Sequence, residues 1–287
     1  MSDIHPGSED GPAPGIEAIG LKRAFAGVRA VDGITFTAPA GAVTALIGPN
    51  GSGKTTLLLL LAGLLQADSG RADIAGHDVL TDNLEARSRV GWMPDAFGTW
   101  DALTCAEILA TFAHAYGIPR KLAPERVSSL LARVHLAEFA NSPARVLSRG
   151  QKQRLGLARA LVHDPEVLLL DEPASGLDPR SRIELRDLLR ELAADGKTVL
   201  VSSHVLSELE EVYDRAVFLS RGRTVGTSAP QPETAGRGSS PWFRTRRGSP
   251  RSRRWTARAR SARGPPARGR SGWRSGGPQC HWLRVRR

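Results

Sequence analysis

The stretch VTALIGPNGSGKTT, residues 43–56, decides the fold of this chain. It opens with the compact apolar run Val43–Ile47, which is typical of a strand buried on both faces of a parallel sheet. A glycine-rich segment of the form G-x-x-x-x-G-K-[ST] follows, and a helix is predicted to begin near Lys54. A strand, a glycine loop and a helix in this order predict an α/β domain of the P-loop NTPase class.

The glycine-rich segment predicts a site for the phosphates of ATP. Its glycines let successive backbone N–H groups turn inward, and the helix N-terminus adds a favourable partial positive charge. Lys54 can reach the β- and γ-phosphates, while the hydroxyl of Thr55 can ligate Mg²⁺. The predicted nucleotide-binding residues of this segment are Gly48, Pro49, Asn50, Gly51, Ser52, Gly53, Lys54, Thr55 and Thr56.

Compact apolar runs recur further along the chain, and helical patterns separate them. Residues 182–194 are one such pattern, because their leucines fall on one helical face and Gly196 can end the helix. Strands that alternate with helices predict a parallel-sheet core. The further parallel strands are predicted at residues 167–170, 198–202 and 216–219.

Two regions depart from this alternation. The first is an antiparallel β region near the start, predicted from short β patterns at residues 16–21, 34–38 and 72–74. The second is a helical insertion over about residues 95–158, where no strand pattern interrupts the helices. Within it Thr104 and Glu107 form a capping-box pattern, and Pro124 can open the next helix.

Two adjacent carboxylates, Asp171 and Glu172, follow the predicted strand at residues 167–170. Successive side chains on an extended chain point apart, so one acid can hold Mg²⁺ while its neighbour faces an attacking water. We assign Asp171 to the metal and Glu172 to general base catalysis. An Asp-Glu pair after a strand is more often an ordinary turn, but its place downstream of a P-loop indicates a catalytic role.

The segment LSRGQ at residues 147–151 resembles LSGGQ, the signature motif of ABC ATPases. The resemblance covers about residues 16–228, and the remaining motifs occur in the expected order. Phe25 corresponds to the aromatic residue that stacks on adenine, residues 175–178 to the D-loop, and His204 to the switch histidine. Residues 93–117 and 202–228 look most like the branch that exports drugs, lipids or polysaccharides.

The resemblance implies a site shared between two subunits that meet head to tail. Ser148 and the N–H of Gly150 would bind the γ-phosphate held by Lys54 of the partner subunit. His204 would contact the γ-phosphate and fix the geometry of water and Glu172. Asp178 would link the two sites across the interface. The implied cofactors are ATP and Mg²⁺, and the implied partners are a second ATP-binding subunit and a separate transmembrane permease.

Two positions depart from the family pattern. Asp95 stands where the glutamine of the Q-loop is usual, and we expect it to keep a link to the metal with altered coupling. A further carboxylate raises the negative charge of a site that already holds Asp171 and Glu172. Arg149 replaces the first glycine of the signature pair, and we expect it to point to solvent or to help bind acidic phosphate.

The charge of the chain is unevenly distributed. Residues 231–287 hold 16 Arg and a single acid, Glu233, whereas residues 1–230 hold 24 basic and 28 acidic side chains. The overall charge of +11 therefore describes the tail and not the domain. Such an Arg/Gly/Pro/Ser-rich tail cannot bury enough apolar area to fold alone. Three interpretations of residues 229–287 remain. They are a shifted reading frame, a basic segment that binds anionic lipid or nucleic acid, and a small folded element.

Several features indicate a cytoplasmic protein, and the resemblance implies that it lies at the inner face of the cell membrane. Residues 1–15 are polar, predicted to be disordered and unlike a signal peptide. The longest apolar run, residues 57–65, is far shorter than the roughly 20 residues of a membrane span. Cys105 and Cys280 lack metal-ligand spacing, as expected of a reducing compartment.

ATP hydrolysis coupled to export is therefore the predicted function, with two alternatives. One is a non-transport ABC ATPase that acts on nucleic acid or ribosomes. It is disfavoured because the chain carries one complete motif set and no long coiled coil, so no specific nucleic acid is expected as a partner. The other is a relic with a folded ATPase head whose damaged C-terminus no longer assembles.

Overall fold

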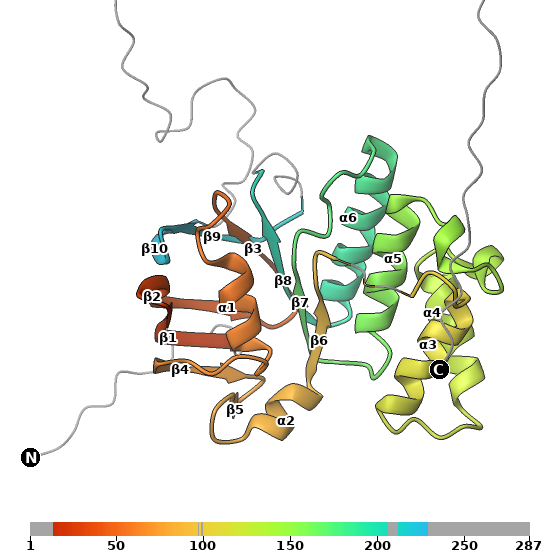
Figure 1. Ribbon diagram of the computed structural model, residues 1–287, viewed down its shortest axis with the longest axis horizontal. Helices are drawn as coiled ribbons and strands as arrows, with labels where there is room; N and C mark the ends of the chain where they lie inside the picture. Colours follow the sequence, from red (N-terminus) through yellow and green to blue (C-terminus); the bar gives the residue numbers. More distant parts are fainter. Residues whose placement is uncertain (1–13, 97, 99, 206–211, 229–287) are drawn as a thin grey trace, which may run out of the picture. The chain divides into compact units, whose positions relative to one another are not determined.

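The computed structural model describes residues 14–96, 98, 100–205 and 212–228 (Figure 1). The chain divides into two units, Met1–Glu233 and Thr234–Arg287, and the second lies wholly outside the described residues. The predictions for residues 1–13 and for the tail 229–287, including Cys280, also fall outside the described residues.

A six-stranded sheet forms the centre of the first unit, in the order β10-β9-β3-β8-β7-β6. Its strands are β3 (Val43–Ile47), β6 (Val90–Met93), β7 (Val167–Leu170), β8 (Thr198–Ser203), β9 (Arg215–Ser220) and β10 (Arg223–Ser228). All neighbours pair in parallel except β10, which is antiparallel to β9. Every residue of β3, β7 and β8 is buried, which confirms the predicted parallel core.

Two strands of this sheet, β6 and β10, are absent from the predicted set. β6 contains Gly91, whose backbone lies so close to its neighbours that an added Cβ would be 2.4 Å from the carbonyl oxygen of Ala160. A glycine inside a short strand weakens the sequence signal while meeting a packing need. β10 is mostly exposed and lacks a buried side of alternating apolar residues.

A second, antiparallel sheet has the order β2-β1-β4-β5. Its strands are β1 (Pro14–Phe25), β2 (Val28–Pro39), β4 (Ser69–Ile74) and β5 (His77–Asp78). The prediction of an antiparallel region near the start is confirmed, and β1 begins at Pro14, inside the stretch predicted to be disordered. Both sheets share one core with the leucines of α1 (Lys54–Leu61), which therefore packs between them.

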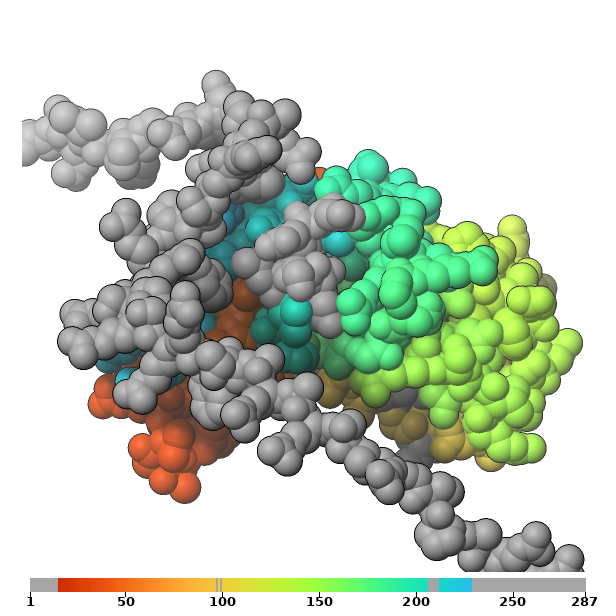
Figure 2. All heavy atoms as spheres, turned by 90° about the horizontal axis from the view of Figure 1, so that it is seen from above, coloured from red at the N-terminus to blue at the C-terminus, as the bar shows by residue number. Residues whose placement is uncertain are grey.

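The opposite face of the parallel sheet is covered by helices α5 (Arg149–Ala160) and α6 (Pro179–Ala194) (Figure 1). α2 (Asn83–Ser88) precedes β6, and α3 (Cys105–Ala115) and α4 (Ala123–Arg133) pack against each other beyond α5. The 3-10 turns η1 (Ala137–Phe139) and η2 (Ala144–Val146) lead into α5. Within residues 14–228, the N-terminal strands and α3–α4 lie at opposite ends, as Figure 2 also shows.

The region between β6 and β7 is helical, as the sequence predicts. Thr104 accepts a hydrogen bond from the N–H of Glu107, and the Glu107 side chain accepts one from the N–H of Thr104. This is the predicted capping box, and Pro124 lies in the first turn of α4. Cys105 is buried at the start of α3. Among the described helices, none combines the length and the apolar character needed to cross a membrane.

Candidate nucleotide-binding site

The glycine loop joins β3 to α1 through close backbone contacts. Gly53 is the N-cap of α1 with φ 101°, and an added Cβ would lie 2.2 Å from the carbonyl oxygen of Ala30. An added Cβ on Gly48 would lie 2.5 Å from the carbonyl oxygen of Leu219. A side chain at either position would clash with backbone, so both glycines are required by the path of the chain. No acidic side chain lies in the first turn of α1, which leaves this helix end favourable to an anion.

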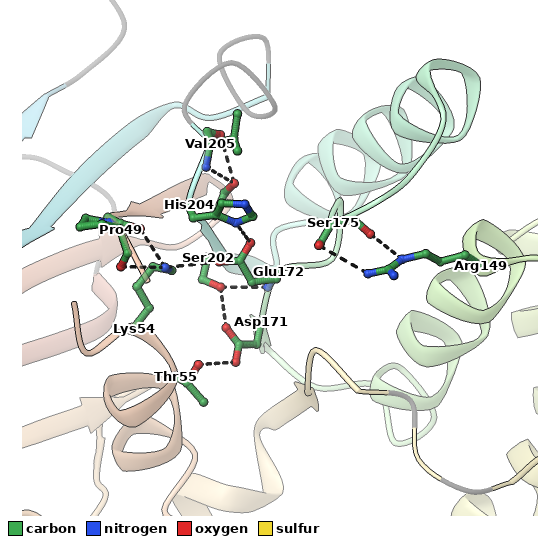
Figure 3. A network of polar contacts seen from close by, with 12 residues as sticks. Pro49, Lys54, Thr55, Arg149, Asp171, Glu172, Ser175, Ser202, His204 and Val205 are labelled. Atoms are coloured by element: carbon green, nitrogen blue, oxygen red, sulfur yellow. Dashed lines mark hydrogen bonds and ion pairs between the residues drawn. The ribbon is translucent and has the colours of Figure 1, made fainter. Parts of the chain in front are cut away.

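Lys54 lies at the base of this loop and is only 6% exposed. Its Nζ donates hydrogen bonds to the carbonyl oxygens of Gly48 at 2.8 Å and Pro49 at 3.5 Å. It also forms an ion pair with Glu172, with Nζ and Oε1 3.3 Å apart. The loop therefore holds the ammonium group beside the place where phosphate oxygens are expected (Figure 3).

Asp171 connects the end of β7 to two other elements. The hydroxyl of Thr55 on α1 donates to Oδ2 at 2.8 Å, and the hydroxyl of Ser202 on β8 donates to Oδ1 at 2.6 Å. The residue is 3% exposed, so these bonds offset the cost of burying its carboxylate. Thr55 and Asp171 thus meet as the sequence predicts for a magnesium site.

Glu172 points away from Asp171, toward Lys54 and His204 (Figure 3). Its Oε2 lies 2.7 Å from Nδ1 of His204, which follows β8. The predicted divergence of the two acids is confirmed, but the predicted cause is wrong. Glu172 has φ 49°, so the chain has already left the extended conformation, and a left-handed residue turns the second carboxylate aside.

These residues line one cleft with a volume of about 430 Å³. Asp95 follows β6 and is exposed within the same cleft, so the structure places it with the predicted site. The charged groups of the lining are Lys54, Asp95, Asp171 and Glu172, a net charge of −2 with His204 neutral. The full lining comprises Ala30, Asn50, Gly51, Gly53, Lys54, Thr55, Thr56, Asp95, Asp171, Glu172, Ser175 and His204.

The donor groups of the cleft fit Mg²⁺ bound together with a nucleotide. The described residues contain no cluster of three His, Cys, Asp or Glu side chains that could hold a metal alone. Mg²⁺ is usually held by one or two carboxylates with substrate phosphates and water, and it prefers oxygen ligands. The Asp171 carboxylate and the Thr55 hydroxyl supply such oxygens from two elements.

The signature residues lie at the start of α5, outside the lining of this cleft. Ser148 is the N-cap, and its hydroxyl accepts a hydrogen bond from the N–H of Gln151 at 3.2 Å. The Gln151 side chain accepts one from the N–H of Ser148, which completes a capping box. Gly150 fits closely against α6, since an added Cβ would lie 2.8 Å from Oγ of Ser181.

Asp178 is the N-cap of α6 and is likewise outside the cleft lining. Its carboxylate accepts hydrogen bonds from the N–H groups of Arg180 and Ser181 and, at 2.7 Å, from the Ser181 hydroxyl. The hydroxyl and N–H of Ser181 lower the pKa of Asp178 below its ordinary value. The carboxylate therefore stays ionised at the N-terminus of α6.

Arg149 is exposed, and its guanidinium also bonds to its own subunit. Its Nε donates to the carbonyl oxygen of Ser175 at 2.8 Å, and its Nη2 donates to the Ser175 hydroxyl at 3.4 Å (Figure 3). The side chain is thus bound to the loop after Glu172 in its own subunit. Arg149 is exposed to solvent, as one alternative expects, and its binding to phosphate stays a prediction. A carbonyl in reach outcompetes water because the guanidinium offers donors in a fixed fork.

Phe25 ends β1 and does not belong to the described cleft lining. Its ring is 44% exposed, and the guanidinium carbon of Arg23 lies 4.9 Å from its centroid. An exposed aromatic face can stack on a base, so its assignment to adenine stays a prediction.

Two residues of the site, Ser202 and Ala30, are absent from the predicted set. Ser202 donates to Asp171, and its Oγ also accepts a hydrogen bond from the N–H of Glu172 at 2.9 Å. The signal for Ser202 was available, because it lies near the carboxyl end of β8, beside the carboxyl end of β7 in a parallel sheet. Ala30 of β2 lines the cleft without a comparable signal in the sequence, and Ser175, in the predicted D-loop, lines it through the loop that follows Glu172.

The fold and the cleft together define a P-loop nucleotide-binding protein. The family described as ABC transporter matches residues 31–175, and the chain belongs to this family. It is an ATP-binding subunit with ATPase activity, as the family and the following relatives indicate.

Two relatives are named for export or drug resistance. A Nod factor export ATP-binding protein I of Burkholderia lata is 39% identical over 219 residues, which cover 76% of this chain and 72% of that protein. The daunorubicin/doxorubicin resistance ATP-binding protein of Streptomyces peucetius is 36% identical over 214 residues, 75% of this chain and 65% of that protein. Both are exporter-branch ATP-binding subunits, which confirms the resemblance drawn from the sequence.

Solved structures agree with this assignment. The structure of cbiO1 from Clostridium perfringens, part of an ABC transporter complex, has a TM-score of 0.70 and 27% identity. The similarity covers 76% of this chain and 89% of that chain. The predicted α/β P-loop fold is therefore confirmed.

Proposed function

We propose that this chain hydrolyses MgATP as one half of a head-to-tail pair and thereby powers export through a separate transmembrane permease. In this proposal the pair lies at the cytoplasmic face of the cell membrane. The observation that carries it is the separation of the two motif sets. The cleft gathers Lys54, Asp171, Glu172 and His204, while Ser148 lies outside it at the start of α5.

The phosphate end of the cleft is prepared by backbone and by Lys54. The two carbonyl oxygens that accept from Nζ fix the ammonium group, so little side-chain entropy is lost when phosphate binds. Lys54 is now neutralised by Glu172. A phosphate would compete for Lys54 and release Glu172 from that ion pair, which makes the carboxylate available to a water molecule.

Mg²⁺ is expected to enter with the nucleotide. A cleft whose lining carries a net charge of −2 repels a polyphosphate, and a divalent cation removes that repulsion. When bound, the ion would shield the phosphate oxygens and withdraw electron density from them. Thr55 and Asp171 would hold it, and Ser202 would keep the Asp171 carboxylate in place.

Glu172 is assigned to general base catalysis, and His204 to its orientation. His204 contacts Oε2 of the carboxylate while Lys54 contacts Oε1, so the two side chains together fix its orientation. In this arrangement Glu172 accepts a proton from the attacking water, and His204 reaches the terminal phosphate. Phe25, as a stacking surface for adenine, and Asp95, as a neighbour of the metal, complete the proposed site.

The second subunit would supply the groups that this cleft lacks. The start of α5 offers the Ser148 hydroxyl and the N–H of Gly150 at a helix N-terminus, where an anion is favoured. Asp178 lies beside them at the start of α6 and would face the partner. ATP held between two such surfaces would stabilise the closed pair over the open one.

Glu172→Gln in the full chain tests the paired site most simply. The variant is expected to bind ATP and to accumulate as a dimer, because hydrolysis no longer resolves the closed state. Analytical ultracentrifugation with and without MgATP measures this. The proposal would be contradicted if Glu172→Gln stayed monomeric at saturating MgATP and the wild-type chain showed no ATPase activity.

The transport role needs a second experiment. The wild-type chain and the membrane proteins encoded beside it are co-expressed, purified through the membrane protein and reconstituted in liposomes. We expect the chain to co-purify with the membrane protein, and we expect the membrane protein to change the ATPase rate of the chain. A chain that is an active ATPase but binds none of these proteins would remove the transport role and leave the ATPase.

A further inference from the structure

Arg149 makes a contact that its position in the helix does not favour. It is the first residue of α5, where a positive charge is opposed by the helix dipole. The guanidinium nevertheless crosses to Ser175, with Nε 2.8 Å from the carbonyl oxygen and Nη2 3.4 Å from the hydroxyl. The hydrogen bond to the carbonyl oxygen of Ser175 offsets the unfavourable interaction of the guanidinium with the helix dipole.

The guanidinium of Arg149 lies directly over Gly176. An added Cβ on Gly176 would lie 2.8 Å from Nε of Arg149, so a side chain there would displace the guanidinium. Gly176 also has φ 67°, a conformation that favours glycine. One residue further along α5, Gly150 lies against Ser181 of α6. The start of α5 and the loop before α6 therefore form one packed unit, here called the signature junction, made of Arg149, Gly150, Ser175, Gly176 and Ser181.

The signature junction connects two surfaces with different partners. Ser175 lines the nucleotide cleft of its own subunit. Ser148 precedes Arg149 and, under the proposed function, binds the nucleotide held by the other subunit. Arg149 is thus the side chain that joins the wall of one ATP site to the phosphate-binding end of the next.

We propose that Arg149 is a positioning residue that couples the two ATP sites of the dimer. This inference rests on the proposed paired function. A nucleotide in the cleft that moves Ser175 would move the start of α5 through the Arg149 contact, and occupation of one site would favour the other. Coupling of this kind appears as cooperativity in the dependence of rate on ATP concentration.

The test compares variants of the full chain. Arg149→Gly removes the contact with Ser175 and gives the signature motif its usual pair of glycines. Arg149→Lys keeps the positive charge but replaces the planar guanidinium with a single ammonium group. Arg145→Gln removes an exposed positive charge from η2, four residues earlier, and is the matched control. Readouts are the Hill coefficient and saturating rate of ATP hydrolysis, ATP affinity of the monomer, and hydrogen exchange of the amides at residues 174–177.

The expected result separates coupling from chemistry. In Arg149→Gly the amides at residues 174–177 exchange about tenfold faster, the cost of one charged hydrogen bond. The Hill coefficient falls from near 2 to about 1, the limit for independent sites. Arg149→Lys shows the same change in the Hill coefficient. Monomer affinity for ATP stays at the wild-type value in all variants, and Arg145→Gln behaves as wild type throughout.

Several results would overturn the coupling role. They are an unchanged Hill coefficient in Arg149→Gly, full recovery in Arg149→Lys, or an equal loss in Arg145→Gln. A wild-type chain that hydrolyses ATP without cooperativity refutes the coupling while the proposed function stands. A wild-type chain that neither hydrolyses ATP nor dimerises refutes the proposed function. In that case, hydrogen exchange of the amides at residues 174–177 still shows whether Arg149 stabilises the loop that contains Ser175.

Discussion

The nucleotide cleft and the start of α5 differ in how their polar groups are satisfied. In the cleft, charged side chains are bonded to one another: Lys54 to Glu172, and Glu172 to His204. At the start of α5, Ser148 is bonded only locally, within its own helical turn, and is exposed. The charged groups of the cleft are thus already paired with one another, whereas the Ser148 hydroxyl is exposed and accepts a single hydrogen bond from its own helical turn. The difference indicates that chemistry belongs to the cleft and recognition to α5.

Loss of Glu172 should have the largest effect. Glu172→Gln is expected to reduce the saturating ATPase rate by about 10²- to 10⁴-fold, the usual contribution of a general base. ATP affinity should change little, because the phosphate-binding loop is intact. Glu125→Gln, in the exposed first turn of α4, is the matched control and should keep the wild-type rate. Retention of more than about a tenth of the rate in Glu172→Gln would reassign the base.

Ser148→Ala should separate recognition from chemistry. The rate is expected to fall about tenfold or more, since a charged hydrogen bond to phosphate is lost, while ATP affinity of the monomer is unchanged. Because Ser148 is also an N-cap, the variant should lose about 1 kcal/mol of stability. Thr104→Ala removes the corresponding cap of α3 and matches that loss. Equal rates in the two variants would show that Ser148 acts only as a cap.

Asp95 tests the charge of the cleft. Asp95→Gln and Asp95→Ala should each change the Mg²⁺ concentration for half-maximal ATPase activity by a few-fold, because each removes one of the three acids that line the cleft. The sign distinguishes its role. A higher requirement means that Asp95 helps to hold the metal, and a lower one means that it only adds repulsion. Magnesium curves that coincide with wild type for both variants would remove Asp95 from the site.

The smallest effect is expected at the junction between the sheet and α3. His163 bonds through Nε2 to the carbonyl oxygen of Val90 at 3.0 Å, and its ring stacks on Tyr116 with centroids 3.8 Å apart. Burial lowers the pKa of His163 below its ordinary value of 6.5. Between the lowered pKa and pH 6.5 the unfolded chain binds more protons than the folded chain. The contribution of His163 to the unfolding free energy is therefore complete above pH 6.5 and is lost as the pH falls toward the lowered pKa.

His163→Phe should therefore flatten the pH dependence of stability. Between pH 7 and pH 5 the unfolding free energy of His163→Phe, measured by urea unfolding, is expected to fall less than that of the wild type. The exposed His114 at the end of α3 gives the control variant His114→Phe, which should keep the wild-type slope. Parallel curves for wild type and His163→Phe would show that His163 does not titrate in this way.

Much of the fold could be predicted because its signals are local. The parallel strands β3, β7 and β8 are continuous apolar runs, and a strand buried on both faces needs no other information. The capping box at Thr104 and the glycine loop are also set by residues close in sequence. The same holds for Thr55 and Asp171, whose types and positions relative to strands were sufficient to place them together.

The rest depends on contacts between distant segments. β6 was not predicted because the glycine at position 91 is required by close packing against Ala160, which is distant in sequence. The direction of Glu172 depends on one left-handed residue, and the orientation of Arg149 depends on the path of the loop at Ser175. For β6 and Arg149 the deciding atom lies on another element, and for Glu172 it is a backbone angle, so periodicity and motif spacing carry no information on any of the three. The assignments of Phe25 and of the dimer contacts remain predictions for the same reason.

Complementation between two variants of low activity tests the division of the site most directly. Lys54→Ala and Ser148→Ala are each prepared as full chains and then mixed. If each site combines the cleft of one subunit with the α5 surface of the other, a mixed dimer holds one intact site, and the mixture should regain up to about a quarter of the wild-type ATPase rate. A mixture no more active than its components would contradict the account, because both motif sets would then have to act within one chain.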